Sequence, residues 1–305
     1  MTGFRTVRAG LRALLRDRSI RRIWLPAYIC GSAVPTEVPL AWIPVGRTLD
    51  LDVDALAPEL RSGDAVMIID YFGRSPASAL IALAAARPDV LWIEDRAQAL
   101  WPDRAPFGEV VLYSPRKLLG VADGGVLVSR APLPQPNADT ELPGLWHSND
   151  ARRADPDGRT PDTWFPGFRV REDEFTSAPA PMSDRTHSLL QSIALAPEAE
   201  IRQANWLMLA QLLPDYALWP EQHPAFVPLA FPVVVENAGN AASCMAAQRV
   251  WCARHWADLP SDADEFPEAH TLAAQCLSLP LDSRYDAEDM ARVAAALRAV
   301  ARKHS

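Results

Sequence analysis

The first 130 residues alternate between short apolar runs and segments whose apolar side chains recur at helical spacing. Runs without polar interruption indicate strands that are buried on both faces, and the helical segments between them indicate crossover connections. The pattern therefore predicts an α/β fold in which helices cover both sides of a mostly parallel sheet, a three-layer α/β/α arrangement. The last two runs are too close for a crossover helix, so one of them is expected to run antiparallel. The predicted strands are 23–26, 40–45, 65–70, 90–95, 109–114 and 125–129, with helices over 53–60 and 77–86.

The arginine-rich N-terminal stretch 6–22 could be mistaken for a transit peptide. It lacks the serine enrichment of such a peptide, and Val7, Leu11, Leu14 and Leu15 recur at helical spacing. We interpret it as an amphipathic helix.

The regular pattern ends at residue 131. The segment 131–181 contains nine prolines and no clean periodicity, which predicts a long irregular loop or lid. We assign it to a large domain over 1–195, which is followed by a small C-terminal α+β domain over 196–305. The expected elements of this second half are helices at 183–195, 198–213 and 241–255, strands at 231–235 and 276–280, and a last helix capped by Asp286.

Composition narrows the class of partner. The net charge is −8, and nucleic acid and anionic membranes both favour a basic surface, so neither is an expected partner. No apolar run approaches the length that a transmembrane helix needs. The four cysteines form no C-x-x-C pair and no histidine cluster accompanies them, so neither a disulfide framework nor a metal site is expected. A reducing cytoplasm fits this composition.

One basic residue differs from the rest. Of thirty basic side chains, twenty-eight are Arg, and the two Lys are Lys117 and the terminal Lys303. Guanidinium cannot lose its proton in a protein, whereas an amine can be deprotonated and attack a carbonyl. Lys117 is therefore a candidate nucleophile, although chance placement explains this single fact equally well.

Three polar groups follow predicted strands. Asp95 ends one strand and Ser114 ends the next, three residues before Lys117, and the pair 124–125 is a glycine turn. In open α/β sheets ligands bind beyond the carboxyl ends of strands, so an acid, a hydroxyl and an amine are expected on one edge. Taken singly, the ordinary structural explanations are favoured, namely caps for Asp95 and Ser114 and a hairpin for the glycines. Their order and spacing together favour a site.

Pyridoxal 5′-phosphate (PLP) requires these three chemistries. A carboxylate keeps its ring nitrogen protonated, an amine holds its aldehyde as a Schiff base, and hydroxyl, amide and cationic donors bind its phosphate. Asp95, Lys117 and Ser114 suit these roles in that order.

Two segments resemble a known family. W-I-E-D-R-A-Q-A-L at 92–100 is similar to the E-D-x-A-Q signature of the DegT/DnrJ/EryC1/StrS aminotransferases, PLP enzymes of fold type I. S-P-R-K-L-L-G-V-A-D-G-G at 114–125 resembles the lysine segment of that family. Weaker matches in the right order extend the resemblance over nearly the whole chain, at 24–28, 70–73, 202–205 and 279–290.

The resemblance implies a role for each matching residue. Lys117 would form the Schiff base, Asp95 would pair with the pyridinium, and Gln98 would lie along the cofactor. Tyr28 or Cys30 would lie over the ring face. Phosphate would be bound by Ser114 together with a loop at Gly3, Phe4 and Arg5 that opens the first helix. A homodimer with a shared active site is also implied.

The leading functional hypothesis is amino transfer from an amino-acid donor to a keto sugar on a nucleotide, or to a related small ketone. Two departures keep other functions open: the partner-subunit element G-Y-N-x-R is at best G-F-R-V-R at 167–171, without Asn, and the glycine turn reads A-D-G-G. One alternative is elimination, decarboxylation or condensation on the same cofactor. The other is a non-catalytic scaffold or regulatory protein, for which the retention of Asp95, Ser114 and Lys117 is the main difficulty.

Overall fold

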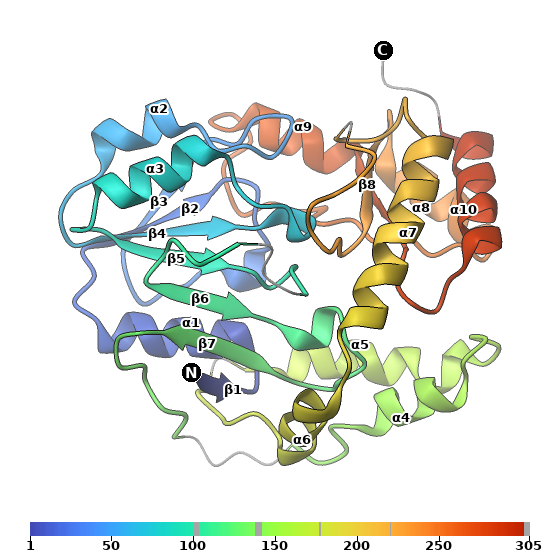
Figure 1. Cartoon of the computed structure of the whole chain (residues 1–305), viewed down its shortest axis with the longest axis horizontal. Helices are drawn as coiled ribbons and strands as arrows, with labels where there is room; N and C mark the ends of the chain where they lie inside the picture. The colour runs from blue at the N-terminus through green and yellow to red at the C-terminus, as the bar shows by residue number, and fades with distance from the viewer. Residues whose placement is uncertain (101–103, 138–141, 177, 220, 302–305) are drawn as a thin grey trace.

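The computed structural model describes residues 1–100, 104–137, 142–176, 178–219 and 221–301, and Lys303 lies outside them. Its main feature is a seven-stranded sheet with the order β1-β7-β6-β5-β4-β2-β3, beside a two-stranded sheet β8-β9 (Figure 1). The seven strands are β1 (Thr2–Phe4), β2 (Arg22–Pro26), β3 (Leu40–Ile43), β4 (Asp64–Ile69), β5 (Leu91–Asp95), β6 (Val110–Tyr113) and β7 (Gly125–Ser129).

The strand prediction is confirmed in position and direction. Strands β2 to β6 pair in parallel, and β7 runs antiparallel to β6. Strand β4, in the interior of the sheet, is buried along its whole length, as the apolar run from Ala65 to Ile69 indicates. Strand β1, which pairs antiparallel with β7, was not predicted, because three residues at a sheet edge are too few to show a periodicity.

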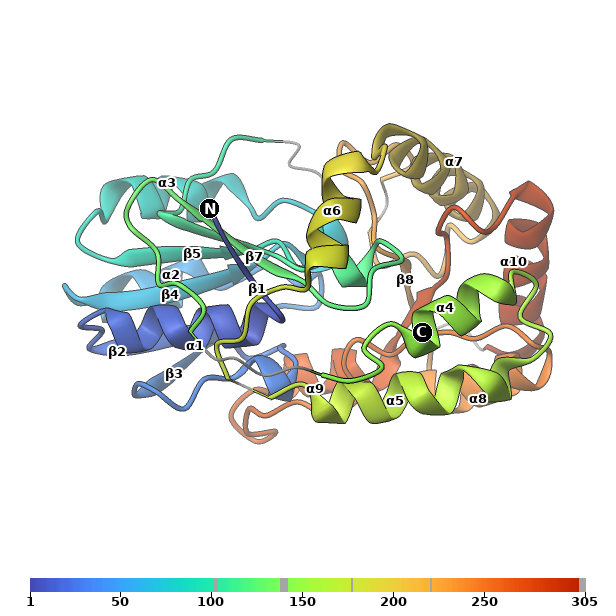
Figure 2. The same ribbon diagram turned by 90° about the horizontal axis from the view of Figure 1, so that it is seen from below.

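Helices cover both faces of this sheet, as the alternation of strands and helices predicts (Figure 2). Side chains alternate between the two faces of a strand. Helix α1 (Val7–Asp17), capped by Thr6, places Leu11 and Leu14 in one core with Ile23 and Met67. Helices α2 (Val53–Leu56) and α3 (Ser78–Ala86) cover the opposite face in a second core, which contains Trp24, Val66 and Trp92.

The C-terminal third packs beside this sheet and shares its larger core. That core includes Trp206, Phe231 and Leu297 as well as the α1 side chains. Its elements are α7 (Ala196–Leu212), β8 (Phe231–Val234), α8 (Ala238–Ala247), α9 (Pro267–Gln275), β9 (Cys276–Leu279) and α10 (Ala287–Val300), with Asp286 as the predicted cap of α10.

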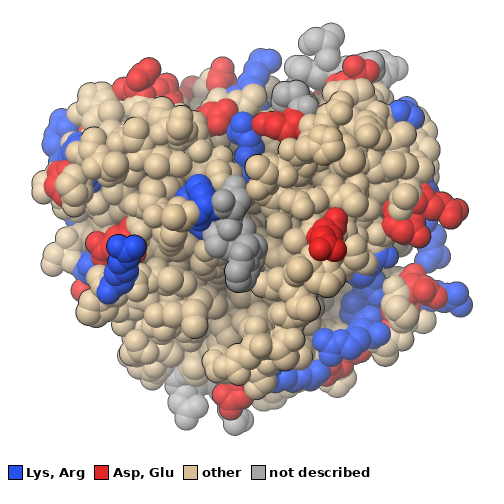
Figure 3. Space-filling model, in the orientation of Figure 1, with Lys and Arg blue, Asp and Glu red and all other residues tan. Residues whose placement is uncertain are grey.

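Two features of this third differ from prediction. Helix α9 was not predicted, and α8 ends at Ala247, well before residue 255, because Arg249 adopts a left-handed conformation with φ of 62°. None of the helices in the described ranges has the length and apolar character needed to cross a membrane. Charges of both signs are interspersed on the face shown in Figure 3.

The prediction of an irregular loop over 131–181 is wrong for much of that segment. It contains α4 (His147–Ala154) and α5 (Phe165–Glu174), followed by α6 (Asp184–Ser192). Neither helix has a buried apolar stripe: α4 buries only Ser148, and α5 leaves Phe165 and Phe168 exposed. Because helix prediction depends on such a stripe, the sequence carried no periodic signal.

Candidate functional site

The predicted acid, hydroxyl and amine meet at the carboxyl-terminal edge of the parallel strands. Asp95 is the last residue of β5 and lies opposite Leu112 of β6. Ser114 follows β6, and Lys117 ends the short 3-10 helix η4 (Pro115–Lys117), where its backbone N–H donates to the Ser114 carbonyl at 3.0 Å. The edge expected from the sequence therefore exists.

Lys117 and Asp95 influence each other's protonation. Desolvation by the surrounding protein lowers the pKa of Lys117, and the Asp95 charge opposes this effect. Desolvation likewise raises the pKa of Asp95, with the Lys117 charge opposing it. The Lys117 side chain remains open to solvent, so water screens part of its shift. The arrangement favours an amine that loses its proton more readily than a free lysine.

Asp95 has one carboxylate oxygen without a protein partner. Its Oδ1 accepts from the Ala97 backbone N–H at 2.9 Å, which is its single hydrogen bond within the described residues. No direct ion pair with Lys117 forms among those residues. A partly buried carboxylate in this state is stabilised by a cationic N–H donor.

Ser114 lies beside the N-terminus of α1. The register of β6 and β7 pairs Tyr113 with Val126, so Ser114 and Gly125 are the next positions along. A Cβ on Gly125 would overlap the backbone of Thr6 and Val7, which shows how closely β7 approaches the helix start. Ser114 is buried, and its hydroxyl has no hydrogen-bond partner in the part of the chain that the structure describes.

The expected phosphate loop at Gly3, Phe4 and Arg5 is not a loop. Gly3 and Phe4 belong to β1 and pair with β7, and Phe4 is fully buried. The Arg5 N–H donates to the Ala180 carbonyl at 2.9 Å, and its carbonyl accepts from Gly124 at 2.8 Å. Sheet pairing and these two loop contacts thus use the backbone groups of the segment. First-turn amides of a helix lack intrahelical acceptors, so those of α1 at Val7 are the available donors at this place.

Gln98 supports a turn next to the site. Its side-chain oxygen accepts from the Phe72 N–H at 2.6 Å, and Gln98 is buried. Phe72 has a left-handed φ of 56°, and a Cβ on Gly73 would lie 2.5 Å from the Val227 carbonyl oxygen. The resemblance had placed Gln98 along the cofactor; in the structure its oxygen is already engaged, which leaves its NH₂ group.

Tyr28 and Cys30 differ in accessibility. Tyr28 is buried, its hydroxyl donates to the His255 carbonyl, and its ring packs against Tyr71 and Trp256 with centroids 5.9 Å apart in each case. Cys30 is half-buried, 3.2 Å from the Ser32 hydroxyl, and interacts electrostatically with Lys117. Of the two, Cys30 is the accessible side chain.

His255, which no sequence motif indicated, is brought to this edge by the fold from the C-terminal third. Its Nδ1 lies 2.9 Å from the Ser278 hydroxyl, and its ring packs edge-on against Phe72 with centroids 5.8 Å apart. Desolvation, together with the charge of Lys117, lowers the pKa of His255 to about 4. His255 is therefore neutral at physiological pH.

A buried ion network lies directly behind Asp95. The Arg96 guanidinium donates to Glu94 at 2.8 Å, and Arg104 bridges Glu94 at 2.6 Å and Asp70 at 3.0 Å. Arg96 and Glu94 are fully buried. Two cations and two anions balance, which removes the cost of an unpaired buried charge and fixes the ends of β4 and β5.

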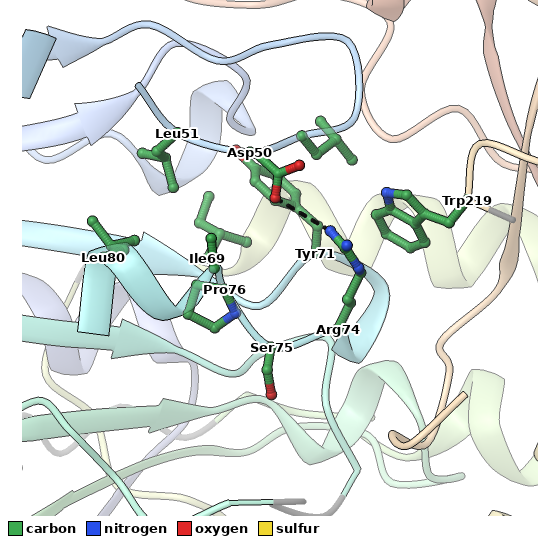
Figure 4. A pocket seen from close by; sticks show the side chains of 11 residues that line it. Asp50, Leu51, Ile69, Tyr71, Arg74, Ser75, Pro76, Leu80 and Trp219 are labelled. Atoms are coloured by element: carbon green, nitrogen blue, oxygen red, sulfur yellow. Dashed lines mark hydrogen bonds and ion pairs between the residues drawn. The ribbon is translucent and has the colours of Figure 1, made fainter. Parts of the chain in front are cut away.

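A small cavity between β4 and the C-terminal third does not serve as the cofactor site. It measures about 20 Å³, enough for about one water molecule. In Figure 4 Arg74 reaches Asp50 at 3.3 Å and lies over the ring of Trp219. The described ranges contain no group of three or more His, Cys, Asp or Glu side chains that could hold a metal ion.

Solved structures share this architecture over nearly the whole chain. One is a Streptococcus pneumoniae protein assigned as a sugar aminotransferase, in its pyridoxamine phosphate (PMP) form. It matches with a TM-score of 0.72 and 14% identity, over 98% of this chain and 85% of its own. The fold is that of the DegT/DnrJ/EryC1/StrS aminotransferases. A protein described by that family name, from Brucella abortus, matches with a TM-score of 0.66 and 16% identity, over 98% of this chain and 85% of its own.

A third structure, that of DesI in the presence of its TDP-sugar product, matches with a TM-score of 0.66 and 15% identity, over 98% of this chain and 79% of its own. At these identities the comparison establishes the fold. No protein-family model and no curated protein matches the sequence.

Proposed function

We propose that this chain is a PLP-dependent aminotransferase of the DegT/DnrJ/EryC1/StrS family, acting on a keto sugar or a related small ketone. The observation that carries the proposal is the meeting of Asp95, Ser114 and Lys117 at the sheet edge of this fold. The DesI structure, with its TDP-sugar product, supports a sugar nucleotide as the acceptor class.

The residues present fit PLP in three respects. The unpartnered oxygen of Asp95 would accept from the pyridine N–H, and that cation would keep the carboxylate ionised although burial raises its pKa. The unpaired Ser114 hydroxyl and the first-turn amides of α1 would bind phosphate. The lowered pKa of Lys117 favours the neutral amine that attacks an aldehyde.

Bound PLP would supply an electron sink for the substrate carbon that loses a proton. Lys117 would hold the cofactor at rest and, once released by the amino donor, would move that proton as general base and then general acid. Cys30, the accessible one of the two candidates, would contact the ring face. Gln98 would act through the turn at Phe72, because its side-chain oxygen accepts a hydrogen bond from the Phe72 N–H.

We place the bulky part of the acceptor near α4. A wide depression of about 600 Å³ lies at the start of that helix, lined by Trp146, His147 and Asp150 among others. The helix also lies beside the chain that follows Lys117, because Arg153 donates to the Gly120 carbonyl at 3.5 Å. The homodimer that the resemblance implies is part of the proposal, and the exposed apolar side chains Phe165 and Phe168 support it.

The colour of the protein with bound PLP tests the proposal. Purified protein with PLP should be yellow and should be bleached by borohydride, and Lys117→Ala should lose both properties while remaining folded. A wild type that stays colourless with added PLP would refute the proposal.

A half-reaction with glutamate then separates amino transfer from the alternatives. Amino transfer predicts accumulation of pyridoxamine phosphate. Elimination, decarboxylation or condensation predicts none, and a scaffold predicts tight PLP binding without turnover of any donor or acceptor. The absence of Asn from 167–171, which lie within α5, is the reason to run this comparison.

A further inference from the structure

Arg116, the residue before Lys117, carries a guanidinium that a neighbouring helix neutralises. Its two terminal nitrogens donate to the two carboxylate oxygens of Glu172 in α5, one of them at 3.0 Å. The guanidinium also lies over the Phe175 ring, 5.1 Å from its centroid. Its Nε is buried and has no hydrogen-bond partner in the described residues. Arg116 therefore still has an unused donor.

A second guanidinium contacts the backbone of the same residue. Arg8, in the first turn of α1, donates to the Glu172 backbone carbonyl at 3.4 Å. Desolvation and the nearby charge of Arg116 lower the pKa of Arg8, which shows that the two cations lie close together. With Lys117 also within electrostatic reach of Arg116 and Glu172, three cations face one carboxylate.

Both guanidiniums border the proposed phosphate position. Arg8 is the second residue of α1, in whose first turn the Thr6 hydroxyl caps only the Ala9 amide. Arg116 stands two residues after the unpaired Ser114. Guanidinium binds phosphate and carboxylate through paired N–H···O contacts of the same geometry, so a carboxylate can stand in for either ligand.

We propose that Arg8 and Arg116 form an oxyanion-binding site at the edge of the Lys117 site, and that Glu172 occupies it until a ligand oxyanion replaces it. The inference rests on the proposed function. The ligand is either the phosphate of the cofactor or the carboxylate of the amino donor, which share this chemistry.

A ligand oxyanion can replace the Glu172 carboxylate on Arg116. The side chains of Arg116 and Glu172 are 16% and 33% exposed, so water reaches the pair and limits its strength. Glu172 is itself partly exposed on α5, so its carboxylate can leave Arg116 by a change of side-chain rotamer, without movement of the helix. Replacement by an oxyanion held also by Ser114 and helix amides would gain donors that Glu172 lacks.

The test compares PLP with pyridoxal, which has the same aldehyde and no phosphate, in titrations of the apoenzyme followed by absorbance. Arg116→Gln and Arg8→Gln should each weaken PLP binding by about tenfold and change pyridoxal binding much less. Glu172→Gln should strengthen PLP binding, because it removes the competing carboxylate. Glu174→Gln, on the same helix and paired with Arg171, is the matched control and should match wild type.

If the variants bind PLP as wild type does, a second measurement tests the donor carboxylate. It is the glutamate concentration that gives half-maximal formation of pyridoxamine phosphate in each protein. A rise in Arg116→Gln together with a fall in Glu172→Gln assigns the site to the donor carboxylate. Folded variants that match wild type in both measurements overturn the inference while leaving the proposed function intact.

If the wild type binds no PLP, the proposed function fails, and the inference is judged with inorganic phosphate. Phosphate should then raise the unfolding temperature of wild type more than that of Arg116→Gln. An equal rise in the two proteins overturns the oxyanion site.

Discussion

Replacing His255 by Asn tests the buried environment that the fold creates beside Lys117. Asn can keep a hydrogen bond to the Ser278 hydroxyl, which lies 2.9 Å from Nδ1, while removing the titrating group. The pKa of His255 is about 4 in the folded protein, against an ordinary value of 6.5. The unfolded chain therefore binds more protons between these two values, so stability is fully present above pH 6.5 and is lost as the pH falls toward 4.

The size of the effect follows from the two pKa values. At pH 5 the difference corresponds to about 2 kcal/mol of unfolding free energy, which partial exposure of the ring reduces to about 1 to 2 kcal/mol. Urea unfolding at pH 7.5 and pH 5 should show that wild type loses this much more stability than His255→Asn. The same substitution at exposed His187 controls for loss of an imidazole. Equal losses in wild type and His255→Asn would refute the argument.

Three further substitutions test the framework of the site. Gly125→Ala should cost about 1 to 3 kcal/mol, because its Cβ overlaps the Val7 backbone, and should weaken PLP binding by shifting the start of α1; an unchanged unfolding temperature would contradict this. Asp123→Asn should cost about 2 kcal/mol and speed amide hydrogen exchange in α6, whose first turn hydrogen-bonds to this carboxylate; unaltered exchange would count against that anchor. Arg96→Met should cost about 3 kcal/mol in urea unfolding, since it leaves the buried Glu94 charge partly unpaired; a loss below 1 kcal/mol would show that Arg104 suffices.

The main sheet could be predicted because its signals are local. A parallel strand covered on both faces is an unbroken apolar run, and β4 shows this from Ala65 to Ile69. The same locality explains why Asp95, Ser114 and Lys117 could be identified as candidates: each follows the end of a strand, and the ends of parallel strands meet at one edge.

The helices α4 and α5 could not be predicted for the opposite reason. Helix prediction needs a buried stripe, and these helices present mostly polar or exposed residues to their surroundings. The first helix was predicted, yet Gly3 and Phe4, which were expected in a loop before it, lie in β1. Gly3 pairs with Val126 of β7, and the backbone of Arg5 bonds to Ala180 and Gly124, which are distant in the sequence.

The strands, their mostly parallel arrangement and the chemical types at the sheet edge can be predicted from the residues alone, because they depend on short-range periodicity and on strand ends. Which of these groups are free to act depends on the folded arrangement. It brings His255 to Lys117 from more than a hundred residues away, engages the oxygen of Gln98 with the Phe72 amide, and places Glu172 on Arg116. Desolvation and partner choice depend on contacts between distant segments, and no local pattern records them.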